Sequence, residues 1–206
     1  MGRSSRQKLP ETPRRNWPVA GLAAAGLIVA GYLALTKLGG ESPLFCTAGS
    51  GCDIVQASRY AVFFGLPTAL WGTGLYAAIG ALALMGLDAR RWLAAFLLAV
   101  VGVSFFAYLT YLELFEIGAV CSYCVLSSLI MVALFGLLLA GRSSVVGRRS
   151  AVRPGRIATL GTITAVVTIL VGAGYFAGDS SHAAGYQEAL ARHLSDSGAI
   201  MYGAYW

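Results

Sequence analysis

The 206-residue chain is 57% hydrophobic and only 12% charged, and its mean hydropathy is strongly positive. These proportions exclude an ordinary soluble domain and indicate an integral membrane protein. The net charge of +6 would suggest a nucleic-acid partner in a soluble protein. In a membrane protein, the positions of the basic residues relative to the membrane spans have to be considered first.

Five apolar stretches are long enough to cross a bilayer, because a helix that rises ~1.5 Å per residue needs roughly 20 residues to do so. The predicted spans are residues 17–38, 67–87, 92–115, 121–140 and 157–178. We interpret the first as a retained span and not a signal peptide, because it is too long for the apolar h-region of a signal peptide and offers no convincing cleavage site.

The basic residues predict the orientation of these spans. The N-terminal tail and residues 88–91 and 141–156 carry 12 of the 15 Lys and Arg residues. All three segments fall on one side of the membrane, so the positive-inside rule predicts a cytoplasmic N-terminus and an outer C-terminus. No aromatic residues are interleaved with the basic ones, which removes the motivation for a nucleic-acid partner.

All four cysteines lie on the predicted outer side. Cys46 and Cys52 fall in the loop 39–66, and Cys121 and Cys124 open the fourth span as a CxxC motif. Disulfides persist in an oxidising compartment, so four cysteines confined to that side suggest thiol–disulfide chemistry.

A zinc site is the first alternative. Five residues separate Cys46 from Cys52, where two to four are usual, and no acidic or histidine second shell is evident. His182 and His193 lie far downstream, and we interpret His193 as a surface residue of an amphipathic helix. The sequence therefore predicts no metal site.

A structural disulfide is the second alternative, and it is a fair interpretation of Cys46 and Cys52 taken alone. For Cys121 and Cys124 it adds little, because a bridge within the first turn of a helix joins residues that the backbone already holds. A helix N-terminus instead favours a thiolate and lowers the pKa of a nearby cysteine. Because the thiolate is the reactive species, the CxxC motif is better explained as a redox couple.

The two cysteines of this couple differ in depth. Cys124 lies about 4.5 Å further along the helix than Cys121, and the same helical face continues through Ser127, Ser128 and Met131. This face either lines a pocket or permits close helix packing. A thiol pair that opens toward lipid needs a membrane-dissolved electron carrier. With no nucleotide or haem motif present, a quinone is the common candidate.

Aromatic residues near the outer ends of the second and third spans could stack on a quinone ring, or could be interfacial belt anchors. They are Tyr60, Phe63, Phe64, Phe105, Phe106, Tyr108 and Tyr111.

These features together resemble the vitamin K epoxide reductase family, specifically its bacterial disulfide-generating homologues. The matching features are the loop cysteine pair, Ser58 six residues after Cys52, "FGLPTALWG" at the second span, and the CxxC motif of the fourth. The resemblance covers residues 17 to about 178. It implies an all-α integral membrane protein with a four-helix transmembrane bundle around a quinone site and a short half-helix at Asp53 to Tyr60. A bacterial subset carries a fifth transmembrane helix.

The resemblance also implies a domain organisation. Residues 1–16 would be a cytoplasmic basic tail and residues 17–178 the transmembrane domain. Residues 179–206 would be an outer linker and the start of a thioredoxin-like domain. "AIMYGAYW" resembles the first strand of such a domain, and the sequence stops at Trp206. The rest of that domain is expected to be missing, or its role to be filled by a separate protein.

By position in the motif, Cys124 is expected to react with the quinone and Cys121 to be its resolving partner. Cys46 is expected to pass electrons to Cys121. Cys52 is expected to be contacted by a thioredoxin-like donor, in a mixed disulfide that Cys46 resolves.

Residues expected to contact the quinone by the same resemblance are Ser58, Val55, Phe64, Leu109 and Ser128. Two features depart from the animal members. Thr68 falls nearest a position where they have an asparagine, and Ser128 stands where they have a tyrosine. These departures make epoxide reduction a weaker expectation. Disulfide formation coupled to quinone reduction is still expected, with a quinone of the ubiquinone, menaquinone, plastoquinone or phylloquinone type.

The sequence thus predicts a membrane oxidoreductase with a redox-active centre, serving oxidative protein folding. Its predicted location is the bacterial inner (plasma) membrane, with the active site on the periplasmic side. The unrelated disulfide-bond formation protein B type is a weaker match, because its CxxC motif lies in the first outer loop. A membrane scaffold or transporter with structural disulfides is the alternative from another class. A transporter's spans should carry substrate-handling charges, whereas Glu113 is the only acid well inside a predicted span.

Overall fold

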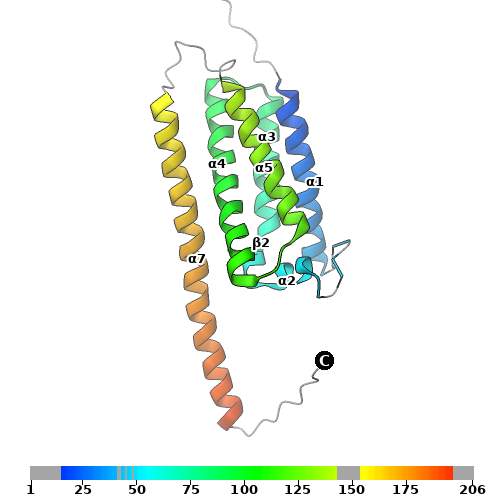
Figure 1. Cartoon of the computed structure of the whole chain (residues 1–206), viewed down its shortest axis with the longest axis vertical. Helices are drawn as coiled ribbons and strands as arrows, with labels where there is room; N and C mark the ends of the chain where they lie inside the picture. The colour runs from blue at the N-terminus through cyan, green and yellow to red at the C-terminus, as the bar shows by residue number, and fades with distance from the viewer. Residues whose placement is uncertain (1–14, 41–42, 45, 48, 143–153, 197–206) are drawn as a thin grey trace, which may run out of the picture. The chain divides into compact units, whose positions relative to one another are not determined.

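The computed structural model describes residues 15–40, 43–44, 46–47, 49–142 and 154–196. The chain divides into two compact units, residues 1–169 and 170–206, and each is considered by itself. Within the first unit, four helices run side by side as a bundle (Figure 1). They are α1 (Trp17–Gly39), α3 (Thr68–Leu84), α4 (Ala89–Leu112) and α5 (Ser122–Ala140).

Local sequence explains where these helices begin and end. The Asn16 side chain accepts a hydrogen bond from the Val19 N–H at 3.3 Å and starts α1. Asp88 does the same for α4 through the Arg91 N–H at 2.7 Å. Helix α3 stops at Leu84, three residues before the predicted end, because Gly86 adopts the left-handed conformation (φ 85°) that terminates helices.

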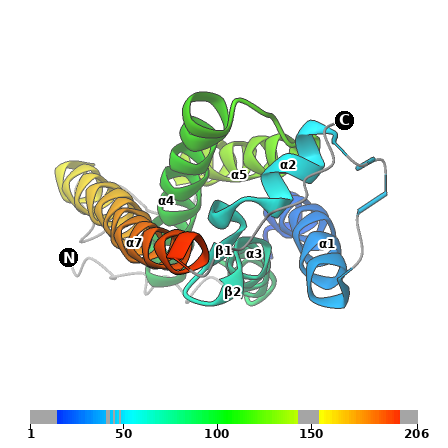
Figure 2. The same ribbon diagram turned by 90° about the horizontal axis from the view of Figure 1, so that it is seen from below.

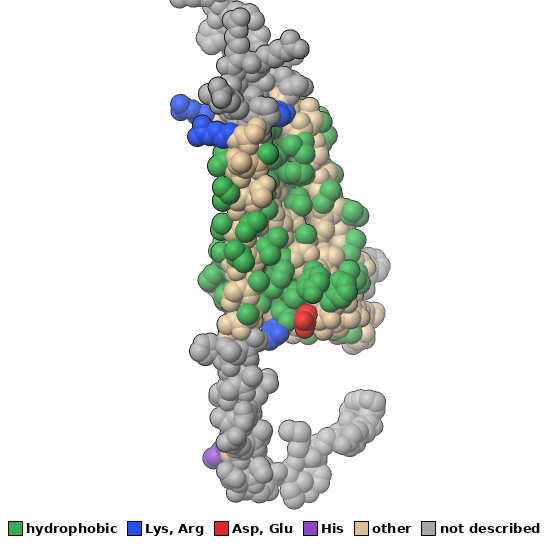
Figure 3. All heavy atoms as spheres, turned by 60° about the vertical axis from the view of Figure 1, so that its left-hand side comes forward, with side chains coloured by type: hydrophobic (Ala, Val, Ile, Leu, Met, Phe, Trp, Pro, Cys, Tyr) green, Lys and Arg blue, Asp and Glu red, His purple; other side chains and the backbone are tan. Residues whose placement is uncertain are grey.

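Within the described part of the chain, four helical segments are long and apolar enough to cross a membrane: Trp17–Gly39, Ala89–Ile117, Ser122–Ala140 and Gly155–Gly178. Helix α3 is a shorter apolar helix of 17 residues, which rises about 25 Å at ~1.5 Å per residue. On the face drawn in Figure 3, hydrophobic side chains are spread over the described surface between basic side chains at one edge and a basic and an acidic side chain at the other. The chain is an all-α multi-pass membrane protein.

Close helix packing builds the core of the bundle. Gly26 of α1 faces the buried ring of Tyr76 on α3 so closely that a Cβ atom there would lie 2.3 Å from the ring. The absence of a side chain at residue 26 therefore permits the close approach of α1 and α3. Helices α4 and α5 are joined by the buried indole of Trp92, which donates a hydrogen bond to the carbonyl of Leu138 at 2.9 Å.

Short elements lie across one end of the bundle (Figure 2). Helix α2 (Gly51–Ala57) and a 3₁₀ turn (Arg59–Ala61) occupy the region expected to hold a single half-helix. Strands β1 (Val62–Phe63) and β2 (Leu66–Pro67) form an antiparallel hairpin. Its turn residues Phe64 and Gly65 both have positive φ, as a tight hairpin turn requires.

The last helix differs from its prediction. Helix α7 is continuous from Pro154 to Asp196, so it extends well beyond the predicted span 157–178 into the segment expected to be a linker. Within the first unit, Ile157 of α7 is part of the hydrophobic core, and Gly161 packs against Phe96. The motif "AIMYGAYW" lies outside the described residues.

Candidate thiol–disulfide site

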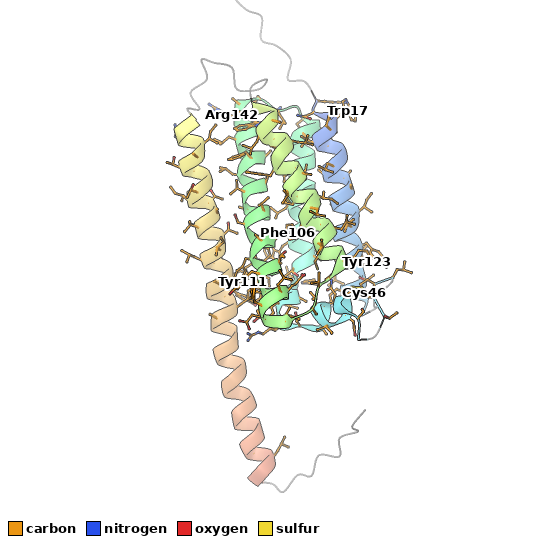
Figure 4. The ribbon with its side chains drawn as sticks, viewed as in Figure 1. Trp17, Cys46, Phe106, Tyr111, Tyr123 and Arg142 are labelled. Atoms are coloured by element: carbon orange, nitrogen blue, oxygen red, sulfur yellow. A yellow bond between two sulfur atoms is a disulfide. The ribbon has the colours of Figure 1, made fainter. Side chains whose placement is uncertain are left out.

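The structure brings the four cysteines together. Cys46 and Cys52 form a disulfide with their Cα atoms 5.4 Å apart, while Cys121 and Cys124 are free thiols. Cys46, Cys52 and Cys121 pack in one buried cluster with Val55, and Cys124 packs against it. Cys46 lies at the opposite end of the bundle from Trp17 and Arg142 (Figure 4). An oxidised pair and a reduced pair are therefore neighbours at one end of the helices.

Two tyrosines hold the loop that carries Cys46. The Leu44 N–H donates a hydrogen bond to the Tyr32 hydroxyl at 2.8 Å, and the Tyr123 hydroxyl donates to the Leu44 carbonyl at 2.7 Å. The two tyrosine rings lie 6.0 Å apart. Because Tyr123 is between the two cysteines of the CxxC motif, its hydroxyl ties the loop directly to that motif.

A glycine allows α2 to approach the same motif. A Cβ atom at Gly51 would lie 2.6 Å from the carbonyl oxygen of Val120, closer than such atoms can approach. Gly51 adjoins Cys52 and Val120 adjoins Cys121. The missing side chain at residue 51 therefore lets the two cysteine pairs pack together.

Cys121 is the N-cap residue of α5. Its sulfur accepts a hydrogen bond from the Cys124 N–H at 3.3 Å, and its side chain is fully buried. A hydrogen bond from the Cys124 side chain, assisted by the N–H groups of Cys124 and Tyr123, lowers the pKa of the Cys121 thiol below its ordinary value, against the opposing effects of burial and of Glu113. The thiolate favoured by the helix start is thus on Cys121, the outer member of the pair.

Glu113 also belongs to this site. From the sequence it was expected inside a predicted span, but it was given no role. It starts a π-helix (Glu113–Ile117) at the end of α4 and is only 5% exposed. Its carboxylate oxygen Oε2 accepts a hydrogen bond from the Cys121 N–H at 3.5 Å, and its side chain also interacts with that of Cys124. The signal in the sequence was an acid inside a predicted span, which by itself marks a functional candidate.

Two small cavities open beside Cys124. The first, of about 50 Å³, lies inside the bundle, and the second, of about 40 Å³, lies under α2. Thr68, Leu109, Glu113, Cys124 and Gln56 line both. A larger hollow of about 280 Å³ between the end of α1 and α2 has no cysteine in its lining, so the cavities beside Cys124 are the better candidates for a redox ligand.

Three of the five residues expected at a quinone line these cavities. Leu109 and Ser128 face the first, and Val55 and Leu109 face the second. Ser58 lines neither and donates its hydroxyl to the carbonyl of Val55 at 2.7 Å. Phe64 also lines neither; it is 58% exposed at the tip of the hairpin.

The aromatic residues that could stack on a quinone also differ in whether they line a cavity. Phe106 lines the first cavity and Tyr60 the second, whereas Tyr111 is exposed and lies with its ring 4.8 Å from that of Phe115. Across the described ranges, no three His, Cys, Asp or Glu side chains are placed to hold a metal ion. His193 is exposed.

A membrane helix bundle that gathers a disulfide and a CxxC dithiol around a small apolar cavity has the architecture of an intramembrane thiol–disulfide protein. Residues 17–139 match the model of the Vitamin K epoxide reductase family, and the chain belongs to that family. It is also similar to the thiol-disulfide oxidoreductase LTO1 of Arabidopsis thaliana, with 30% identity over 201 residues that cover 85% of this chain and 52% of the relative. The chain thus spans about half the length of that relative.

Proposed function

We propose that the protein is a membrane thiol oxidoreductase that generates disulfides. In this proposal, electrons pass from a thioredoxin-like partner through the Cys52/Cys46 pair and then the Cys121/Cys124 pair to a quinone. The observation that carries the proposal is the packing of the Cys46–Cys52 disulfide against the free thiol of Cys121 in one buried cluster. Family membership and the similarity to the Arabidopsis thiol-disulfide oxidoreductase support it.

Electron entry requires exchange at the loop disulfide. A thiolate of the partner attacks the sulfur of Cys52, and Cys46 leaves as a thiolate. The second thiol of the partner then releases Cys52 and leaves with the partner's new disulfide. We assign this second step to the partner and not to Cys46 as expected from the resemblance, because attack by Cys46 would return the electrons to the partner.

Transfer between the two pairs follows the same chemistry. When the CxxC motif is oxidised, the Cys46 thiolate attacks Cys121, and Cys124 leaves as a thiolate. Cys52 then attacks Cys46, which restores the loop disulfide and frees Cys121. One disulfide is broken and one is formed, so two electrons move inward. The tyrosine contacts at Leu44 and the absence of a side chain at Gly51 keep the reacting sulfurs close.

The cavity beside Cys124 has the chemistry expected of a quinone site. Most of the surface that lines it is apolar, and hydrogen-bonding groups come from Gln56, Thr68, Thr110, Glu113, Ser127 and Ser128. A bound quinone would accept the two electrons that are released when the Cys121–Cys124 disulfide forms. A volume of about 50 Å³ admits only a few water molecules, so side chains such as Phe106 and Leu109 must move to admit a ring.

The proposed location is the bacterial inner membrane, with the cysteine end on the periplasmic side. Arg90 and Arg91 start α4 and Arg142 follows α5, so these basic residues lie at the end of the bundle away from the cysteines. By the positive-inside rule that end faces the cytoplasm. The proposed transmembrane domain is residues 17–178, and a thioredoxin-like partner would meet Cys52 at the outer face.

The test of this function is anaerobic quinone reduction by the purified protein in lipid nanodiscs. A dithiol should reduce a short-chain quinone with the wild-type protein and not with Cys124→Ala. The second candidate, a scaffold or transporter with structural disulfides, would be favoured if no dithiol changed the quinone absorbance.

A further inference from the structure

Glu113 stands out because its surroundings are those of a reacting group. Among the described residues, Glu113, Ser104 and Ser127 are the buried polar or charged side chains, and Glu113 alone of these carries an ionisable group. Its interactions are with the backbone of Cys121 and the side chain of Cys124. Burying a carboxyl group is costly, so its presence beside the CxxC motif calls for a chemical explanation.

The local backbone is built to place this carboxyl. Helix α4 changes to a π-helix at Glu113, and the widened turn ends at Gly118, whose φ of 68° reverses the chain toward Cys121. The Glu113 carbonyl accepts a hydrogen bond from the Ala119 N–H at 3.2 Å, which closes the turn. Such π-helical turns are frequent at functional sites.

Glu113 also bridges the thiols and the cavity. It touches Cys124 and lines both small cavities, so its carboxyl is between the sulfur that must lose a proton and the space where a quinone oxygen would gain one. Among the residues that the structure describes, no other acidic side chain lines these two cavities. Proton transfer needs a group close to both donor and acceptor, and Glu113 interacts with Cys124 and shares the lining of both cavities with it.

We propose that Glu113 is the proton carrier of the CxxC couple: its carboxylate takes the proton of the Cys124 thiol and releases it toward the cavity as the disulfide forms. The proposal rests on the proposed function in needing a quinone as the electron acceptor. It makes Glu113 a catalytic residue, because the carboxyl contacts the reacting sulfur.

The atoms and electrons of this step balance. Oxidation of the dithiol breaks two S–H bonds, forms the Cys121–Cys124 S–S bond and releases two electrons and two protons. Reduction of a quinone to a hydroquinone consumes both. Glu113 carries the Cys124 proton to one oxygen and ends in its starting state. The Cys121 proton leaves to water at the outer turn, and water supplies the second hydroquinone proton.

Other ionisable groups near the carboxyl must be separated from it. Because Cys121 and Cys124 interact, their titrations are coupled, and a Cys121→Ser background removes that coupling. Serine can still cap α5. In that background Cys124 is the one free thiol while the loop disulfide is intact. The other ionisable groups on neighbouring elements include Lys37 in α1, Asp53 in α2, Arg59 and Tyr60 in the 3₁₀ turn, Tyr76 in α3, Tyr108 and Tyr111 in α4, Glu116 in the π-helix and Tyr123 in α5.

The first arm of the test needs no quinone. The rate of Cys124 alkylation is measured against pH by mass spectrometry in Cys121→Ser protein. With Glu113 present, the Cys124 proton has a nearby acceptor. A plot of the alkylation rate against pH should therefore rise in two steps that are separated by a nearly flat region. Adding Glu113→Gln should remove the lower-pH step and leave a single limb that rises tenfold per pH unit, because the carboxyl can no longer take the thiol proton. Adding Glu116→Gln, on the exposed side of the π-helix, should leave the profile unchanged.

The opposite result is equally clear. If Glu113 did not share a proton with Cys124, the profile would keep one limb whether or not the carboxyl is present. A single limb already present with Glu113 in place, or a two-step profile that persists in Glu113→Gln, overturns the proposal. If the Gln variant does not fold, Glu113→Asp decides the question. It should keep the two-step profile, and a single limb in that variant overturns the proposal.

The second arm separates this proposal from the proposed function. With native Cys121, quinone reduction is compared for the wild type, Glu113→Gln and Glu116→Gln across the same pH range. A slow Gln variant beside an active wild type supports proton transfer by Glu113. A wild type that reduces no quinone refutes the proposed function, while the alkylation arm still tests the Glu113–Cys124 proton transfer. Equal rates and equal pH profiles for the wild type and Glu113→Gln refute the role of Glu113 alone.

Discussion

The sulfur of Cys121 accepts a hydrogen bond from the N–H of Cys124 at 3.3 Å, so the first cysteine of the CxxC motif caps the helix that carries the second. The sequence predicted that a helix start would favour a thiolate, and the structure assigns that effect to Cys121. Cys124 lies inside the helix and beside the cavity. The outer cysteine is therefore suited to exchange with Cys46 and the inner one to a partner within the membrane.

The lowered pKa of Cys121 predicts a specific pH dependence. Its thiolate should form below the ordinary cysteine value of about 8.5. Exchange that uses this thiolate should stay fast as the pH falls below that value and decline only when the pH falls through the lowered pKa. Alkylation of Cys121 followed against pH by mass spectrometry measures this. Cys124→Ala removes the main stabilising hydrogen bond and should move the midpoint upward; an unchanged midpoint contradicts the explanation.

Gly51→Ala should slow transfer between the two cysteine pairs. The new Cβ would clash with the Val120 carbonyl, and the resulting shift of α2 should reduce the rate roughly ten- to a hundredfold, as small misplacements of reacting groups do. Acid quenching after addition of a dithiol, followed by mass analysis of each pair, gives this rate. Gly39→Ala is the matched control, since a Cβ there meets open space. Equal slowing in both variants would contradict a local effect.

Tyr123→Phe should weaken the attachment of the Cys46 loop. The change removes the hydrogen bond to the Leu44 carbonyl and leaves the ring in place. We expect slower exchange between Cys46 and Cys121, while reduction of the Cys46–Cys52 disulfide by an external dithiol keeps its rate or increases. The same quenched time course separates the two steps. Tyr111→Phe, at an exposed ring on α4, should change neither.

Tyr76→Phe should destabilise the bundle without touching a cysteine. The Tyr76 hydroxyl donates to the Ser127 carbonyl at 2.6 Å and lies 3.1 Å from the Ser127 hydroxyl. Hydrogen bonds between membrane helices contribute about 0.5–2 kcal/mol, and the variant should lose an amount in that range. Unfolding by denaturant in mixed micelles measures the loss. Equal stability would mean that the Ser127 groups find other partners.

Much of the bundle could be predicted from the sequence because long apolar stretches leave little choice of structure. The prediction placed α1 and α5 within one residue at each end. It placed the end of α3 too late because "LALMGLD" stays apolar past the helix, and only the backbone conformation of Gly86 marks the stop. The length of α7 was missed because the polar residues after 178 suggested a linker, although helices can continue in polar sequence.

The candidate site was only partly predictable. Cysteine spacing identified two pairs, but their packing depends on contacts between distant segments, such as Gly51 with Val120 and Leu44 with Tyr123. The place of Glu113 beside Cys124 depends on a π-helical turn, for which the sequence carries no periodic signal. Ser58 and Phe64 were chosen by position in a motif, and the local backbone directs both away from the cavities beside Cys124.

The most direct test of the account is anaerobic reduction of a short-chain quinone by a dithiol, catalysed by the purified chain in nanodiscs. The wild type should turn over, and Cys124→Ala should not. The Cys46–Cys52 disulfide of that variant should still be reducible. Sustained quinone reduction by Cys124→Ala, or none by the wild type with any dithiol, would contradict the proposed path from the loop disulfide through the CxxC motif.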